Sequence, residues 1–195
     1  MGEYKFVKYD FENPSFFEVF LDETLKILVG ELLFYNSFIK TFELKGHERV
    51  LDFGCGSGFG SRCIAKKLTD RGSLTCVDIS NFWTSKAKKR LRHYSNIEFK
   101  VGNIEEMDIP DSSFDVISII HVIHDIEPQK RQGVVNALSN KLKDSGTLFL
   151  WEPIRTSHGM PAQEIKELMS KAGLREVVNK QSKSTYKGEF KKAIS

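Results

Sequence analysis

The chain has 195 residues, of which 40% are apolar and 28% charged, the composition of an ordinary globular protein. This length can bury a substantial core, so we expect residues 1–195 to form a single domain. No stretch approaches the roughly 20 apolar residues that a membrane span needs. A net charge of +3 is too small to indicate nucleic acid as a partner, and the oligomeric state is left open.

The three cysteines indicate a reducing compartment. Cys55, Cys63 and Cys76 form neither a C-x-x-C pair nor an even set for disulfides, so buried, reduced thiols are expected. The first residues also lack the apolar stretch of a signal peptide. Both features predict a cytoplasmic protein.

In chain order, two apolar-rich helical segments come first, at 14–29 and 31–42, and Ser15 and Glu18 form a capping box in the first. Strand and helix patterns then alternate. Strands are expected at 49–53, 74–77, 97–101, 114–121 and 147–152, and helices at 58–68, 82–94 and 128–142. A helix at 162–172 and a terminal strand pair at 174–179 and 186–193 complete the chain. Such alternation implies an α/β fold with a parallel sheet covered on both faces.

Two strand ends carry the features that point to a ligand. After the first strand, Gly54, Gly56 and Gly58 occupy alternate positions, where glycine permits positive φ and close backbone approach. The helix that follows offers free N–H groups and a partial positive charge. The alternative is a tight turn that binds nothing.

The second strand ends in Asp78, 24 residues after Gly54. A carboxylate at this place in dinucleotide-binding folds accepts the hydroxyls of an adenosine ribose. Asp78 could instead cap a helix, but Ser80 and Asn81 are available as caps. We therefore expect an adenosine-containing cofactor.

The run 51–58, Leu-Asp-Phe-Gly-Cys-Gly-Ser-Gly, resembles motif I of the class I S-adenosylmethionine-dependent methyltransferases that modify small molecules. The resemblance continues through 77–80, 102–105, 114–117 and 142–148, where Asp144 and Ser145 replace the family's usual Pro-Gly. It implies a Rossmann-like, doubly wound, mostly parallel seven-stranded sheet with an antiparallel last strand. It also implies that residues 1–45 form an N-terminal helical cap over the active site.

The same resemblance implies S-adenosylmethionine as cofactor and assigns the residues that contact it. These are Asp52, Phe53, Gly54, Cys55, Gly56, Gly58, Asp78, Ile79, Asn103, Ile104 and His121. Asp52 would hold either the loop or the amino group of the cofactor. Asn103 would accept from the adenine amino group, or else be a turn asparagine.

His121 and His124 follow the fourth strand and are the candidate catalytic residues. Histidine can take a proton from an acceptor hydroxyl or amine near neutral pH, although either residue could be a structural histidine instead. Glu152, at the end of the fifth strand, is a further cavity candidate or a solvated loop acid. Because these histidines lack a clear set of further ligands, the sequence predicts no metal site.

The function expected from these motifs is methyl transfer from S-adenosylmethionine to a small-molecule acceptor by in-line displacement. The connection from Glu152 to residue 162 is too short for a separate acceptor domain. Two alternatives stay open. One is a non-catalytic, methyltransferase-like binding subunit. The other is an NAD-linked oxidoreductase, whose G-x-G-x-x-G fingerprint would need glycine where Phe59 stands.

Overall fold

The computed structural model describes residues 4, 6, 9–15, 19 and 35–193. They belong to two compact units, one of Met1–Tyr9 with Ile104–Ser195 and one of Asp10–Asn103. The predicted helix at 14–29 lies for the most part outside the described residues, and so does the start of the one at 31–42. Of the expected cap at 1–45, the structure describes residues 4, 6, 9–15, 19 and 35–45, among them α2 (Asn36–Lys40), so the cap stays a prediction.

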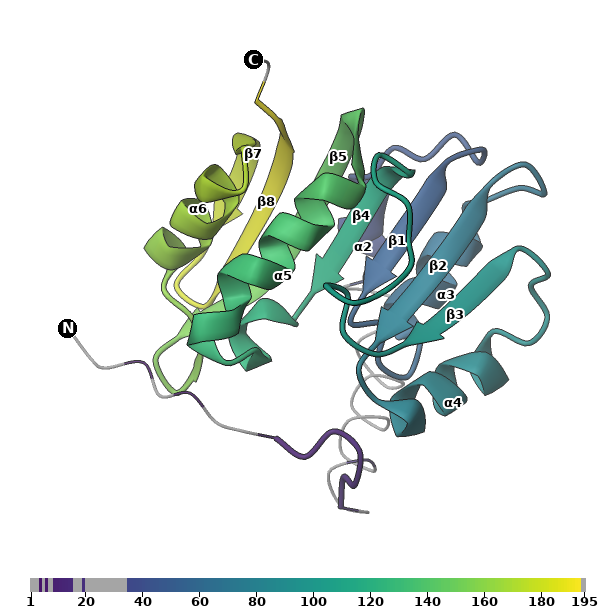
Figure 1. Ribbon diagram of the computed structural model, residues 1–195, viewed down its shortest axis with the longest axis horizontal. Coiled ribbons are helices and arrows are strands. Elements are labelled where there is room, and N and C mark those ends of the chain that lie inside the picture. Colours follow the sequence, from purple (N-terminus) through teal and green to yellow (C-terminus); the bar gives the residue numbers. More distant parts are fainter. Residues whose placement is uncertain (1–3, 5, 7–8, 16–18, 20–34, 194–195) are drawn as a thin grey trace. The chain divides into compact units, whose positions relative to one another are not determined.

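The unit of residues 10–103 contains three parallel strands, with β2 (Ser73–Asp78) between β1 (Arg49–Phe53) and β3 (Ile97–Val101) (Figure 1). Helices α3 (Phe59–Ala65) and α4 (Asn81–Arg90) connect them. All three strands and both helices were predicted. Because the strands are parallel, their carboxyl ends meet at one edge, where the glycine loop and the acidic residue lie.

Helix α4 departs from its prediction at its end. It begins where expected, with the Ser80 hydroxyl accepting the Trp83 N–H at 3.2 Å. It ends at Arg90 because the chain tightens there into a turn, in which the Tyr94 N–H donates to the Leu91 carbonyl. The buried side of the helix therefore centres on Ala87 and Leu91, while Trp83 is only half-buried.

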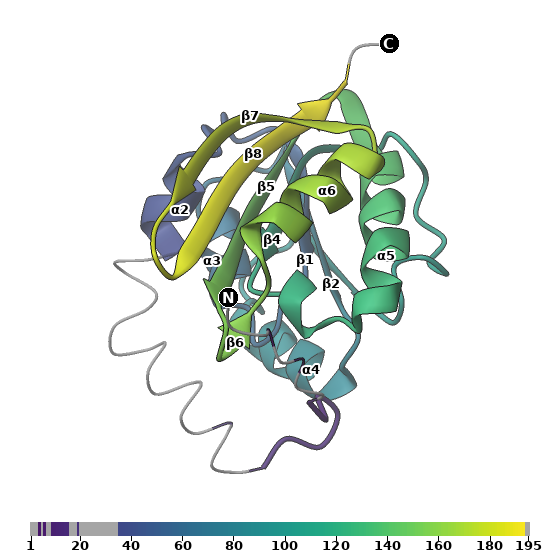
Figure 2. The same ribbon diagram turned by 90° about the vertical axis from the view of Figure 1, so that its left-hand side faces the viewer.

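The other unit contains β4 (Phe114–Ile120), β5 (Leu142–Arg155), β8 (Thr185–Lys192) and β7 (Leu174–Gln181), side by side in that order. Strands β4 and β5 are parallel, and β8 runs antiparallel to both of its neighbours (Figure 2). The predicted antiparallel last strand is thus confirmed. A two-residue strand, β6 (His158–Gly159), folds back on the end of β5.

Helix α5 (Pro128–Lys141) packs on β5 and also against α6 (Ala162–Lys171), which packs on β7. The turn η2 (Ile123–Asp125) follows β4. With helices between parallel strands and an antiparallel β8, the Rossmann-like, mostly parallel α/β fold class is confirmed. Among the helices of the described segments, none is long and apolar enough to span a bilayer.

Candidate functional site

The loop after β1 has the backbone conformation that its glycines predict. Gly54, Gly56 and Gly58 have φ angles of 72°, 52° and 85°, in the left-handed region that other residues rarely adopt. A Cβ on Gly56 would meet no atom within 4 Å, whereas one on Gly58 would lie 3.1 Å from Ala87 of α4. Gly56 therefore borders open space that a ligand can enter, while Gly58 lets the loop pack against α4.

Asp78 holds this loop through its carboxylate. Its Oδ2 accepts the Gly56 N–H at 2.8 Å, and its Oδ1 accepts the Ser80 N–H at 3.0 Å. Burial raises the pKa of Asp78, and these backbone hydrogen bonds oppose that rise. Ser80 caps α4 as expected, but Asp78 also has a loop-holding role that the sequence did not reveal. Each carboxylate oxygen has a second lone pair, so a ribose contact remains compatible with both bonds.

Asp52 lies buried beneath the loop and accepts a hydrogen bond of 2.6 Å from the Ser61 hydroxyl in α3. It holds the start of the helix, in keeping with the loop-holding alternative. Phe53 and Cys55 beside it are buried, and a hydrogen bond with Cys76 together with burial raises the pKa of the Cys55 thiol. All three cysteines are buried, as expected, and each has a free thiol.

Four features around the loop fit a nucleoside cofactor. Gly56 borders open space, and the buried Ser57 hydroxyl has no hydrogen-bond partner among the described residues. Ile79, directly after Asp78, is 63% exposed, so its apolar side chain is accessible to a ligand at this strand end. Asn103 follows β3 at the same edge of this unit, whereas Ile104 is buried and belongs to the other unit.

A short N-terminal segment lies against the end of β2. The Ser80 hydroxyl donates to the Phe11 carbonyl at 2.7 Å, and the Asn81 N–H donates to the Glu12 carboxylate at 2.9 Å. Asp10 stabilises the segment locally by accepting the N–H groups of Glu12 and Asn13. No local pattern predicts this contact, because it joins residues 69 positions apart.

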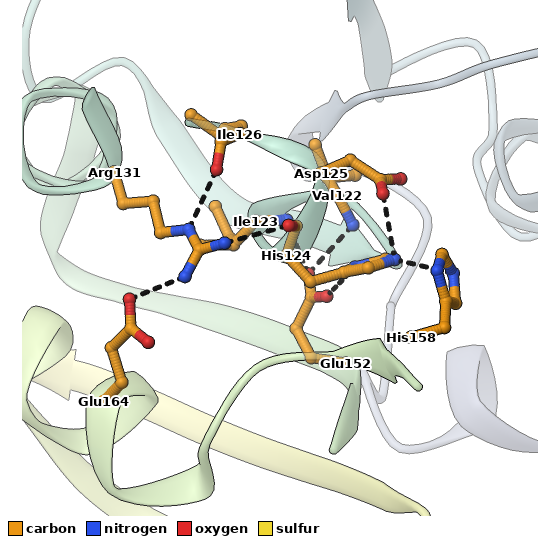
Figure 3. A network of polar contacts seen from close by, with 9 residues as sticks. All are labelled: Val122, Ile123, His124, Asp125, Ile126, Arg131, Glu152, His158 and Glu164. Atoms are coloured by element: carbon orange, nitrogen blue, oxygen red, sulfur yellow. Dashed lines mark hydrogen bonds and ion pairs between the residues drawn. The ribbon is translucent and has the colours of Figure 1, made fainter. Parts of the chain in front are cut away.

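In the other unit, Glu152 organises the turn after β4 (Figure 3). Its side chain is fully buried, and Oε1 accepts the N–H groups of Val122 and Ile123 at 2.9 and 2.8 Å. Its Oε2 lies 2.6 Å from Nδ1 of His124. Glu152 is therefore a buried acid with partners at both oxygens and not a solvated loop residue.

His124 is buried, and both of its ring nitrogens have partners. Nε2 lies 3.0 Å from Nε2 of His158 and 3.3 Å from Oδ1 of Asp125. Burial lowers the pKa of His124, but the hydrogen bond and charge of Glu152 outweigh it and raise the pKa. Burial raises the pKa of Asp125 to about 6, and burial together with the charge on His124 lowers the pKa of the exposed His158.

Arg131 of α5 ties this turn to α6. Its guanidinium is buried and donates to the carbonyls of His124 and Ile126, both at 2.9 Å, and to the Glu164 carboxylate at 2.6 Å. One side chain thus satisfies two loop carbonyls and one acid. The turn that carries His124 is rigidly held from two sides, by Glu152 and by Arg131.

His121 lies next to this cluster but differs from His124 in exposure. Its side chain is exposed, and its backbone has φ 58°, a strained value for a residue with a Cβ. Its ring centroid lies 4.8 Å from that of Trp151 and 6.5 Å from that of His124. The structure thus brings together His121, His124 and Glu152, as expected from the strand ends. Asp125 and His158 were not predicted, and His158 lies on a strand too short to show a period.

Comparison with known proteins agrees with these geometries. Residues 50–146 match the family model described as a methyltransferase domain. The chain is 37% identical over 86 residues to the ubiquinone/menaquinone biosynthesis C-methyltransferase UbiE of Rickettsia bellii, which is 41% of this chain and 35% of that protein. It is 28% identical over 152 residues to phosphoethanolamine N-methyltransferase 1 of Arabidopsis thaliana, covering 75% of this chain and 29% of that one. The chain therefore spans well under half the length of these curated relatives.

A solved structure extends the likeness to almost the whole fold. The TehB-like SAM-dependent methyltransferase of Corynebacterium glutamicum superposes with a TM-score of 0.75 at 15% identity, covering 93% of this chain and all of that one. At this identity the likeness concerns the fold alone. The family match identifies the chain by its sequence. The superposition and the glycine loop joined to Asp78 agree with that match in architecture. The chain belongs to the class I S-adenosylmethionine-dependent methyltransferases.

Proposed function

We propose that the chain binds S-adenosylmethionine at the loop 54–58 and Asp78 and transfers its methyl group to a small-molecule acceptor. The observation that carries this proposal is the hydrogen bond from the Gly56 N–H to the Asp78 carboxylate. It joins a positive-φ glycine loop to an acid-ended neighbouring strand in a chain of this family. A loop fixed in this way is preorganised to bind a nucleoside.

In this proposal the two ends of the cofactor meet different chemistry. Asp78 accepts the ribose hydroxyls with its remaining lone pairs, and the exposed Ile79 covers one face of the adenine. Asn103 accepts from the adenine amino group. The methionine portion lies along Gly54 and Gly56, and at Gly56 the backbone borders open space. Some residues of the expected contact set are buried and support the loop from the protein interior: Asp52, Phe53 and Cys55.

The reaction needs little covalent chemistry from the protein. The sulfonium of the cofactor carries an activated methyl group, so the protein aligns the acceptor, excludes water and removes a proton where the acceptor has one. We propose His121 as the base that accepts this proton, because its imidazole is exposed. His124 is buried and its Nδ1 is bound to Glu152. We therefore assign it a positioning role and not the role of the base. Ile104 and His121 stay expected cofactor contacts on the family resemblance alone.

Support for a small acceptor comes from the relatives. Their names give quinone biosynthesis and phosphoethanolamine as the chemistry they serve. These substrates belong to proteins that are longer than this chain, so only the coarse class, a small organic molecule, enters the proposal.

Calorimetry tests the proposal directly. We expect S-adenosylmethionine and S-adenosylhomocysteine to bind the chain, NADH not to bind, and Asp78→Ala to weaken both sulfur nucleosides at least about tenfold, the equivalent of 1.4 kcal/mol. Asp70→Ala, at an exposed acid of the same unit, is the matched control and should leave affinity unchanged. Binding of NADH alone would support the oxidoreductase alternative. Cofactor binding without turnover on any acceptor, and copurification with a partner, would support the binding-subunit alternative.

A further inference from the structure

Three ligand-bearing side chains converge in the unit that carries β4 and β5. They are His124 from the buried turn η2, its neighbour Asp125, and His158 from β6 (Figure 3). One nitrogen or oxygen from each lies within 4.8 Å of the other two. We propose that these three residues bind a divalent transition-metal ion such as Zn²⁺. The inference rests on this cluster alone and does not depend on methyl transfer.

The spacing of the ligand atoms matches what such an ion requires. Nε2 of His124 is 3.0 Å from Nε2 of His158 and 3.3 Å from Oδ1 of Asp125. Bonds of about 2.0–2.1 Å to a tetrahedral Zn²⁺ place neighbouring ligand atoms roughly 3.3 Å apart. The His124–Asp125 separation equals that edge and the His124–His158 separation is about 0.3 Å shorter, while the ligand atoms of Asp125 and His158 lie within 4.8 Å of each other and would have to approach the ion.

The second ring nitrogen of His124 is bound as metal-site histidines usually are. Nδ1 lies 2.6 Å from the Glu152 carboxylate, whose other oxygen is held by two backbone N–H groups. A proton on Nδ1 donated to Glu152 leaves the Nε2 lone pair directed at Asp125 and His158. A carboxylate behind a ligating histidine fixes its tautomer and strengthens it as a ligand.

The charges of the cluster favour a dication. Two carboxylates contact His124, those of Asp125 and Glu152, and the guanidinium of Arg131 behind it pairs with a third, that of Glu164. The charges of Asp125 and Glu152 therefore remain to be balanced next to His124. One proton on His124 balances half of that charge, and a divalent cation balances all of it.

The cluster is open on one side. His124 is buried and Asp125 half-buried, but His158 is exposed, and Tyr9 packs edge-on against its ring at 6.2 Å. Two histidines and one carboxylate leave further coordination positions to water or to an oxygen of a bound small molecule. An ion here would polarise that oxygen and lower the pKa of the bound water or hydroxyl group. The sequence-based prediction of no metal site is replaced by this inference, because only the fold brings His158 to His124.

Metal binding is measured on the full, untagged chain after chelation. We expect Zn²⁺ to bind with one ion per chain by calorimetry and elemental analysis, and Co²⁺ to give visible ligand-field bands of an N/O site. His158→Asn and Asp125→Asn should each lower Zn²⁺ affinity by more than the roughly 10–100-fold typical of losing a supporting residue, and Glu152→Gln by about that factor. His158 is exposed, so its replacement leaves the buried turn intact.

His93→Asn is the matched control, since it removes an exposed histidine from the other unit. It should bind Zn²⁺ as the unmodified chain does. Equal affinity in His158→Asn, an equal loss in His93→Asn, or no binding by the folded, chelated chain overturns the inference. The binding of S-adenosylmethionine is measured on the same samples, so a failed metal site and a failed cofactor site give different results.

Discussion

The carboxylate of Asp78 accepts the backbone N–H of Gly56 at 2.8 Å, across 22 residues of sequence. This one bond ties the open side of the glycine loop to the end of β2, and the Ser80 N–H completes the arrangement at 3.0 Å. Asp78 thus belongs both to the scaffold of the loop and to its proposed ligand contacts. Removing it should affect stability and binding together.

We predict that Asp78→Asn separates these two roles in part. The amide keeps one acceptor oxygen but places an NH₂ group opposite a backbone N–H, so the free energy of unfolding should fall by about 1–3 kcal/mol. Affinity for S-adenosylmethionine should fall at least about tenfold, because one ribose acceptor is lost. Chemical denaturation and calorimetry measure the two effects. Asp70→Asn serves as control, and unchanged affinity in Asp78→Asn would remove the ribose role of this residue.

The pH dependence of binding gives a second prediction. Burial raises the pKa of Asp78. This carboxylate therefore becomes protonated at a higher pH than an ordinary aspartate does. Its protonated form is the weaker acceptor, and we expect affinity for S-adenosylmethionine to decline as the pH is lowered through that raised pKa. The decline should be absent in Asp78→Asn. Calorimetry across the acidic range measures it, and an identical pH profile in both proteins would contradict the prediction.

Gly56 and Gly58 form a matched pair for a third prediction. Both have positive φ, so alanine costs each about 1–2 kcal/mol of backbone strain. A Cβ at position 56 enters open space, whereas one at position 58 meets Ala87 at 3.1 Å. Gly56→Ala should therefore fold but lose cofactor affinity, and Gly58→Ala should lose more stability. Thermal denaturation and calorimetry on both variants measure this, and the reverse order would contradict it.

The sequence predicted the elements whose signals are local. Strands β1 and β3 begin and end where their apolar runs predict, and the glycine loop has the positive φ angles that its spacing indicates. The contact between Gly56 and Asp78 depends on the parallel register that sets Phe53 beside Val77, and no local pattern reports a register.

The histidine cluster shows the same limit more strongly. The sequence placed His121, His124 and Glu152 at strand ends, which is a topological inference that parallel strands make dependable. His158 comes from a two-residue strand that exists only because β6 folds back on the end of β5. No period can be detected in two residues. The full burial of Glu152 is likewise a consequence of packing, because an acid at a strand end is ordinarily solvated.

Tyr186 carries a prediction for the stability of the β7–β8 pair. Its side chain is fully buried and its hydroxyl donates to the Glu176 carboxylate; burial together with this bond raises the pKa of Tyr186 far above its ordinary value. Tyr186→Phe removes the donor, and because Glu176 is half-exposed, we expect a loss of only about 1 kcal/mol. Tyr94→Phe is the control, within about 0.5 kcal/mol of the unmodified chain. Urea denaturation measures both, and equal stability of Tyr186→Phe would remove the role of this bond.

Glu152 carries the last prediction, because three donors converge on it in a fully buried position. Glu152→Gln still accepts from one or both backbone N–H groups, but its NH₂ group faces Nδ1 of His124 and forces the other tautomer of that ring. Breaking this buried pair should lower the free energy of unfolding by about 3 kcal/mol.

The control is Glu98→Gln, an exposed acid paired with Lys100, for which we expect at most about 1 kcal/mol. Denaturation gives the stabilities, and nitrogen NMR of labelled histidine reports which nitrogen of His124 carries the proton. A destabilised variant with an unchanged tautomer would mean that Glu152 supports the turn through Val122 and Ile123 alone. A changed tautomer would show that the same carboxylate also directs Nε2 of His124 toward Asp125 and His158, since the fold offers Nδ1 no second acceptor of comparable charge and distance among the described contacts.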